Sequence, residues 1–151
     1  MSMASKLRAV AGVGPAGWSR IVHTLVVSRR IEHSLSHKQL DATARRFGAT
    51  LSFEPPARVD RRLPITADES AQLSLALAVL RQGLVNGTCL RRALVMADVV
   101  RDHQPVLRVG VAKNLGKVTA HAWVEVSGIA IDPMADREFL VLRSPSRAGR
   151  A

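Results

Sequence analysis

Apolar and polar side chains alternate strictly over residues 117–126, which predicts a β-strand with two different faces. One face carries Val118, Ala120, Ala122, Val124 and Val126, and the other carries Thr119, His121, Trp123 and Glu125. Ser127 and Gly128 then predict a two-residue hairpin turn that pairs Val126 with Ile129. Continued along the hairpin, this register places Asp132 opposite Trp123 and diagonal to His121. A slip of one residue would put His121 and Asp132 on opposite faces.

Two helices are predicted in the first third of the chain. The first covers residues 19–34, with Ser19 as its cap and an apolar side that includes Val22 and Val26. Ser36 and Gln39 have the spacing of a capping box for a second helix. This helix is expected to end at Phe47 because Gly48 follows it.

Two further helices are predicted before the alternating strand. Thr66 and Glu69 form a second capping box, which predicts a largely buried helix over residues 67–84. Another helix is expected over residues 90–102, with Thr88 as its N-cap and Cys89 in its first turn. There, free backbone N–H groups and the positive end of the helix dipole favour a thiolate over a thiol.

Shorter extended segments are expected at residues 51–53, 106–112, 129–131 and 138–142, with a turn at 113–116. Helices followed by an antiparallel sheet define an α+β fold. We expect an N-terminal helical region at residues 1–53, a Pro- and Arg-rich linker at 54–65, a core at 66–142 and a disordered tail at 143–151.

Composition adds a strong positive charge and a single thiol. The 151 residues carry a formal net charge of +10, which predicts attraction to acidic partners. One cysteine rules out an internal disulfide and fits a reducing compartment, so we expect a cytoplasmic protein. Residues 1–13 do not resemble a signal peptide, and no apolar run approaches the ~20 residues that span a membrane.

Cys89, His121 and Asp132 are the candidate catalytic residues. A lone cysteine followed by a histidine and an aspartate fits a nucleophile, its general base and the acid that orients the base. The same residue types also occur as a small buried thiol, a packed histidine and a turn aspartate. Spacing alone leaves both interpretations open.

Four motifs in order resemble the lasso-peptide leader peptidases, a family of cysteine proteases with a transglutaminase-like core. They are T-C-L-R-R-A-L at 88–94, R-V-G-V-A-K at 108–113, A-H-A-W-V-E-V at 120–126 and I-D-P at 131–133. The resemblance covers residues 66–141, and more loosely 40–53. It implies the roles of nucleophile for Cys89, general base for His121 and orienting partner for Asp132.

The resemblance also implies a substrate and partners. The substrate would be the leader–core junction of a ribosomally made lasso-peptide precursor. Family members of this short form lack a fused recognition domain, and act with a separate leader-recognition protein and beside an ATP-dependent cyclase. No cofactor is implied.

Several residues around the expected site have less definite roles. Candidates for binding substrate or the oxyanion are Gln82, Asn86, Thr88 and Trp123. His33 and His37 are four residues apart, but lack a His-Glu-x-x-His pattern and further ligands, so no metal site is expected.

Two other functions remain open from the sequence. One is an acyl transferase with the same triad, similar to transglutaminases or arylamine acetyltransferases. The other is a basic nucleic-acid-binding module, because L-D-A-T-A-R-R-F-G-A-T at 40–50 resembles part of a helix-turn-helix. The extended segment expected after it leaves no room for a recognition helix, so no nucleic acid is expected as a partner.

Overall fold

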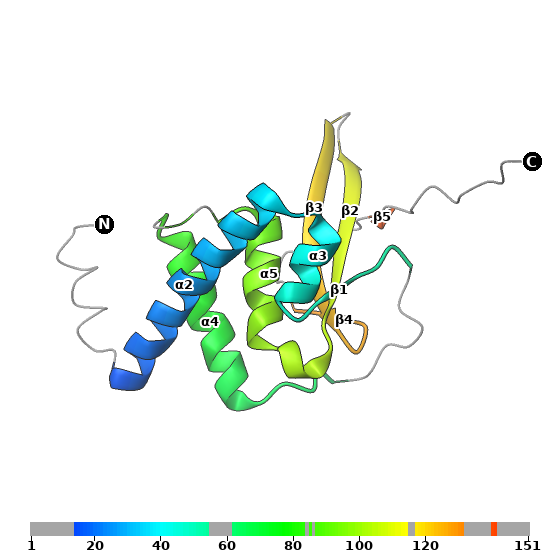
Figure 1. The fold of residues 1–151 in the computed structure, drawn as a ribbon. Coiled ribbons are helices and arrows are strands. Elements are labelled where there is room, and N and C mark those ends of the chain that lie inside the picture. Colours follow the sequence, from blue (N-terminus) through cyan, green and yellow to red (C-terminus); the bar gives the residue numbers. More distant parts are fainter. Residues whose placement is uncertain are drawn as a thin grey trace, which may run out of the picture.

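The computed structural model describes residues 14–54, 62–83, 85, 87–114, 117–131 and 140–141. The helices lie on one side of a small sheet (Figure 1). They are α2 (Pro15–His37), α3 (Leu40–Arg46), α4 (Ala67–Arg81) and α5 (Cys89–Val99), followed by a short 3-10 helix, Arg101–His103. This arrangement confirms the predicted α+β fold. In the described part of the chain, no helix is both long and apolar enough to cross a bilayer.

The sheet is mixed, not antiparallel throughout. Its strands are β1 (Thr50–Leu51), β2 (Val106–Asn114), β3 (Lys117–Val126), β4 (Ile129–Ala130) and β5 (Leu140–Val141). They follow the order β1-β2-β3-β4, and β5 also pairs with β2. The expected antiparallel sheet is wrong for β1, which runs parallel to β2. The long connection through α4 and α5 allows the chain to return in the same direction.

The hairpin between β3 and β4 has the predicted register. Val126 pairs with Ile129, and Glu125 pairs with Ala130. Ser127 and Gly128 both have positive φ, 51° and 78°, which is the backbone of a type I′ turn. The pairing continues beyond β4, because the N–H of Ile131 donates to the carbonyl of Val124 at 2.9 Å.

Helix α5 occupies the centre of the hydrophobic core. Its Leu94 and Ala97 belong to one buried cluster with Val124 of β3 and with Val27 and Ile31 of α2. A second cluster joins Met96 and Val100 to Val126 of β3 and Leu73 of α4. Each buried Leu, Ile or Val side chain stabilises the fold by about 1.5–3 kcal/mol. The start of α5 is therefore held in place by packing along the rest of the helix.

The two N-terminal helices differ from the prediction at their ends. Helix α2 begins at Pro15 rather than at Ser19, because proline has a preset helical φ and suits a first turn. It also continues to His37, so Ser36 is still helical and its hydroxyl donates to the carbonyl of Glu32 at 2.9 Å. The predicted capping box at Ser36 is therefore wrong. The N-cap of α3 is Gln39, and it makes no side-chain capping bond.

The local signals at the other helix ends are confirmed. Thr66 and Glu69 form the predicted capping box at the start of α4, with the N–H of Glu69 donating to Thr66 Oγ1 at 3.2 Å. Gly48 follows α3 with φ of +84°, the conformation that ends a helix.

Some element bounds differ from those expected. Helix α4 ends at Arg81 instead of residue 84, and α5 ends at Val99 instead of residue 102. Strand β2 runs to Asn114, beyond the predicted end at 112, so Lys113 and Asn114 belong to the strand and not to the predicted turn. The predicted strand at 138–142 is present as Leu140–Val141. The domain boundaries stay a prediction, and the expected tail at 143–151 lies outside the described residues.

Candidate active site

Cys89 is the first residue of α5 and is half-buried. Thr88 is the N-cap, as predicted, but its side chain makes no capping bond to the backbone. Thr88 Oγ1 instead accepts a hydrogen bond from Arg91 Nη1 at 3.1 Å. The first backbone N–H groups of a helix have no partner within the helix. The thiol therefore lies beside donors that are suited to an oxyanion.

The first turn of α5 is anchored to α2 by an ion pair between Arg91 and Glu32. Arg91 Nη2 donates to Glu32 Oε1 at 2.9 Å, and Arg91 Nε donates to the other carboxylate oxygen. This bidentate hydrogen bonding by Arg91 lowers the pKa of the Glu32 carboxyl below its usual value. The side chain of Arg91, two residues after Cys89, is thus held against α2. This contact limits movement of the N-terminal end of α5.

His121 is buried in the middle of β3, with 6% of its surface exposed. It pairs with Gly110 of β2, which has no side chain to crowd the imidazole. The ring stacks on the indole of Trp123, with 6.1 Å between ring centroids and 13° between planes. Trp123 is buried to the same extent. The indole therefore holds one side of the imidazole ring.

The two faces of β3 have different neighbours. Val124 and Val126 pack in the core with α5. Successive residues of a strand point to opposite faces, so His121 and Trp123 belong to the face of β3 opposite Val124 and Val126. Cys89 is the first residue of α5 and is half-buried, on the same helical stripe as the buried Ala93 and Ala97. Any approach of the thiol to His121 therefore takes place at the N-terminal end of the helix.

A buried polar network behind Trp123 was not predicted from the sequence. Trp123 Nε1 donates to Glu125 Oε1 at 3.0 Å, and Arg108 Nε donates to Glu125 Oε2 at 2.9 Å. Arg108 is 3% exposed and pairs with Trp123 across the sheet. The same guanidinium also donates to Ser52 Oγ at 2.8 Å and to the carbonyl of Glu54. Glu125 thereby fixes the indole that stacks on His121.

Two charged residues within the predicted strands are the sequence signal for this network. Glu125 shares a face with His121 and Trp123, and Arg108 falls within an apolar strand, where a charged side chain needs a partner. We infer that Glu125 and Arg108 are positioning residues, because Arg108 holds Glu125, Glu125 holds Trp123, and Trp123 stacks on His121.

The remaining predicted site residues are placed as follows. Thr88 is exposed, and Gln82 is exposed at the C-cap of α4. Asn86 and Asp132 lie outside the described residues. The catalytic triad and the oxyanion-binding residues therefore stay predictions.

Residues 35–144 match the profile of the Transglutaminase-like superfamily, and the chain belongs to this superfamily. The match includes α3, all of α4 and α5, and the strands that carry Arg108 and His121. The superfamily is generally enzymatic and includes cysteine proteases and acyl transferases. Comparison of the chain with curated proteins and with solved structures gives no match.

Proposed function

We propose that the protein is a cysteine peptidase that removes the leader from a lasso-peptide precursor. The main support is the position of Cys89, a half-buried thiol that begins a helix packed on the strand of a buried histidine. Membership of the transglutaminase-like superfamily supports a thiol nucleophile at this position. The motifs around Cys89 and His121 support the leader peptidase over other members. A free thiol nucleophile suits a cytoplasmic enzyme.

In the proposed reaction, His121 accepts the proton of Cys89, and the thiolate attacks the carbonyl carbon of the scissile peptide bond. Backbone N–H groups at the start of α5 stabilise the oxyanion. The C–N bond breaks as His121 donates its proton to the leaving amine, which leaves an acyl-enzyme on the sulfur. His121 then takes a proton from water, the hydroxide attacks the thioester, and the thiolate leaves.

Two other residues are proposed to position His121. Asp132 would orient the imidazole and stabilise its charged form, as the acid of a triad does. It directly follows Ile131, whose N–H is hydrogen-bonded to Val124 of β3. Trp123 would hold the ring by stacking, because it stacks on His121 and is itself bound by Glu125.

The deciding experiment is cleavage of a lasso-peptide precursor, read by mass. Incubations with and without the separate leader-recognition protein, and with the cyclase, show which partners the cut needs. We expect one cut at the leader–core junction. Cys89→Ala and His121→Ala should abolish it, whereas His103→Ala, beyond the opposite end of α5, should retain it. An uncut precursor with all partners present would contradict the proposal.

An acyl transferase is the second candidate, because the same superfamily includes such enzymes. It would pass the acyl group from Cys89 to an amine instead of to water. Adding a simple primary amine or acetyl-CoA to the incubation separates the two functions. An amine-linked product or consumption of acetyl-CoA, in place of a free carboxylate, would favour the transferase.

A further inference from the structure

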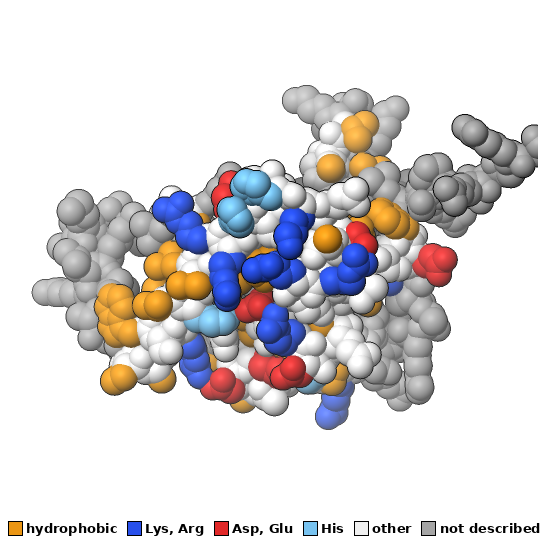
Figure 2. Space-filling model, in the orientation of Figure 1, with side chains coloured by type: hydrophobic (Ala, Val, Ile, Leu, Met, Phe, Trp, Pro, Cys, Tyr) orange, Lys and Arg blue, Asp and Glu red, His pale blue; other side chains and the backbone are white. Residues whose placement is uncertain are grey.

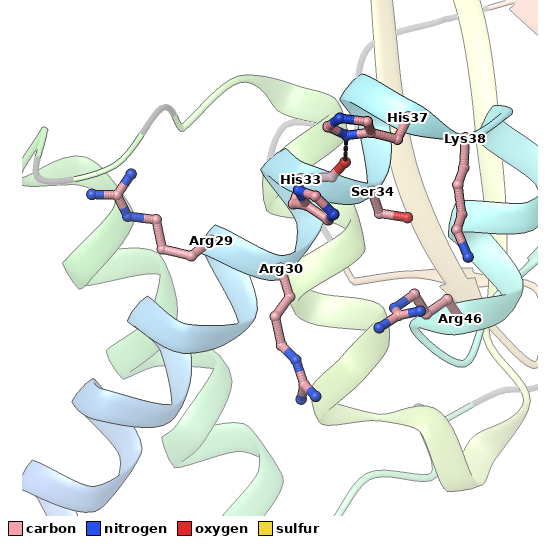
Figure 3. Close-up of a pocket in the computed structure, with 7 residues that line it drawn as sticks. All are labelled: Arg29, Arg30, His33, Ser34, His37, Lys38 and Arg46. Carbon is pink, nitrogen blue, oxygen red and sulfur yellow. Dashed lines mark hydrogen bonds between the residues drawn. The ribbon is translucent and has the colours of Figure 1, made fainter.

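A basic pocket of about 530 Å³ lies where the end of α2 meets α3 (Figure 3). It is lined by Arg29, Arg30, His33, Ser34, His37, Lys38 and Arg46. Arg30 of α2 and Arg46 of α3 extend toward the same space, with Lys38 above them (Figure 3). Lys and Arg side chains also gather over this face of the molecule in Figure 2. The pocket size is within the range of ordinary ligand sites.

The positive charge of this pocket is not balanced locally. Its lining has no carboxylate, and Arg30, Lys38 and Arg46 make no ion pair with any residue the structure describes. Arg29 points away from these three (Figure 3) and is, after Arg91, one of the charges that lower the pKa of Glu32. The acidic residues nearby have other partners. Glu32 pairs with Arg91, Asp41 with Arg45, and Asp98 with Arg101 and His23. A bound anion would therefore relieve repulsion among Arg30, Lys38 and Arg46.

The pocket is also firmly built. Ser34, which lines it, is 3% exposed, and its hydroxyl forms a hydrogen bond with Thr43 of α3 at 3.0 Å. This bond fixes the angle at which the two helices meet. His37 Nδ1 lies 2.8 Å from the carbonyl of His33, and the two imidazole rings are 4.3 Å apart. A ligand thus meets a preformed concave surface, not a set of independent surface side chains.

A second pocket of about 280 Å³ continues the first and shares Arg30 and Arg46 with it. The combined groove is longer than one phosphate group and suits several anionic groups along a chain. It also contains Asp98, but this carboxylate is already paired with Arg101 and His23. The one aromatic carbocycle, Phe47, is 4% exposed and offers no face for a base to stack on. Cations spaced along a groove without a stacking face suit separate carboxylates on a polypeptide.

We propose that the basic pocket binds an acidic segment of a polypeptide, with Arg30, Lys38 and Arg46 receiving its carboxylates. Guanidinium groups bind carboxylates through paired hydrogen bonds, which favours arginine at such a site. The pocket lies on the part of α2 that Glu32 and Arg91 tie to the first turn of α5. The proposal concerns binding alone and does not depend on the reaction at Cys89.

The test measures binding of fluorescein-labelled hexaglutamate to the full-length protein by fluorescence anisotropy at physiological salt, where distant surface charges are screened. Hexaglutamine, hexauridylate and tripolyphosphate serve as comparison ligands. We expect hexaglutamate to bind, and hexaglutamine not to bind. The double variant Arg30→Gln/Arg46→Gln should weaken binding about tenfold, because two charge-assisted contacts are lost.

The matched control is Arg62→Gln/Arg81→Gln, which removes the same charge from exposed positions outside the pocket. It should change affinity less than about twofold, since only screened charges are removed. Lys38→Glu provides a second pocket variant, and circular dichroism checks that each variant is folded. Equal weakening by both double variants would overturn the proposal, as would tighter binding of hexauridylate or tripolyphosphate than of hexaglutamate.

Discussion

The indole N–H of Trp123 donates to the carboxylate of Glu125 at 3.0 Å, two residues further along the same strand face. The other carboxylate oxygen accepts from Arg108 on the neighbouring strand at 2.9 Å. Trp123 also stacks on His121. The indole that stacks on the imidazole is therefore held by a buried ion pair between neighbouring strands.

The first prediction concerns this ion pair. Glu125→Gln leaves the buried Arg108 guanidinium without its counter-charge, and we expect a loss of about 3 kcal/mol in the free energy of unfolding. Urea unfolding, followed by circular dichroism, measures the change. In a Trp18→Phe background, the fluorescence of Trp123 alone should also shift, because its hydrogen-bond partner changes. A loss below about 1 kcal/mol would contradict a structural role for the pair.

The second prediction compares two glycines with positive φ. At Gly83, φ is +73° and an added Cβ meets nothing within 4 Å, so Gly83→Ala should cost about 1–2 kcal/mol from backbone strain alone. At Gly48, φ is +84° and the Cβ would lie 2.6 Å from Cβ of Arg101. Gly48→Ala should therefore be clearly more destabilising than Gly83→Ala. Equal melting temperatures for the two variants would show that Arg101 moves freely.

The third prediction concerns stability in acid. The N–H of Thr66, then its hydroxyl and His103, lower the pKa of the Glu69 carboxyl below its usual value. A carboxyl with a lowered pKa stabilises the fold above its usual pKa, and this stabilisation is lost as the pH falls through the lowered value. Between pH 5 and pH 3, Glu69→Gln should thus lose less stability than the unmodified protein.

Urea unfolding midpoints, measured at intervals across this pH range, give the slope of stability against pH. Asp102→Asn, an exposed residue of the short helix after α5, serves as the control and should keep the original slope. An unchanged slope in Glu69→Gln would mean that the capping box does not contribute to the acid sensitivity.

The fourth prediction concerns the thiol. Because Cys89 is the only cysteine and is half-buried, iodoacetamide should label exactly one site in the folded protein. If His121 accepts the thiol proton, His121→Ala should slow labelling at neutral pH by about tenfold or more, as expected for loss of a general base. His103→Ala should leave the labelling rate unchanged. Mass spectrometry at timed intervals gives the rates.

The sequence predicts well those features that depend on neighbouring residues. The capping box at Thr66, the helix stop at Gly48 and the hairpin turn at Ser127 are each decided within four positions. The predicted start of α2 failed because Pro15 is a better first-turn residue than the sequence pattern suggested. The capping box at Ser36 failed because α2 continues through it.

The features that were missed depend on residues far apart in the chain. The parallel pairing of β1 with β2 joins Thr50 to Val106, and no local pattern specifies it. The contact of Arg108 with Glu125 requires the register of two strands. In the same way, the basic pocket requires α3 to fold back so that Arg46 faces the same space as Arg30. In the sequence, the spacing of His33 and His37 raises only the question of a metal site and gives no sign of this pocket.

The pairing of β1 with β2 has a practical consequence for shortening this protein. The N–H groups of Thr50 and Ser52 donate to the carbonyls of Pro105 and Leu107, and α2 contributes Val27 and Ile31 to the same core as α5. A fragment that began at α4 would expose both the backbone groups of β2 and the apolar side of α5. Such a fragment is expected to self-associate instead of folding as a smaller monomeric domain.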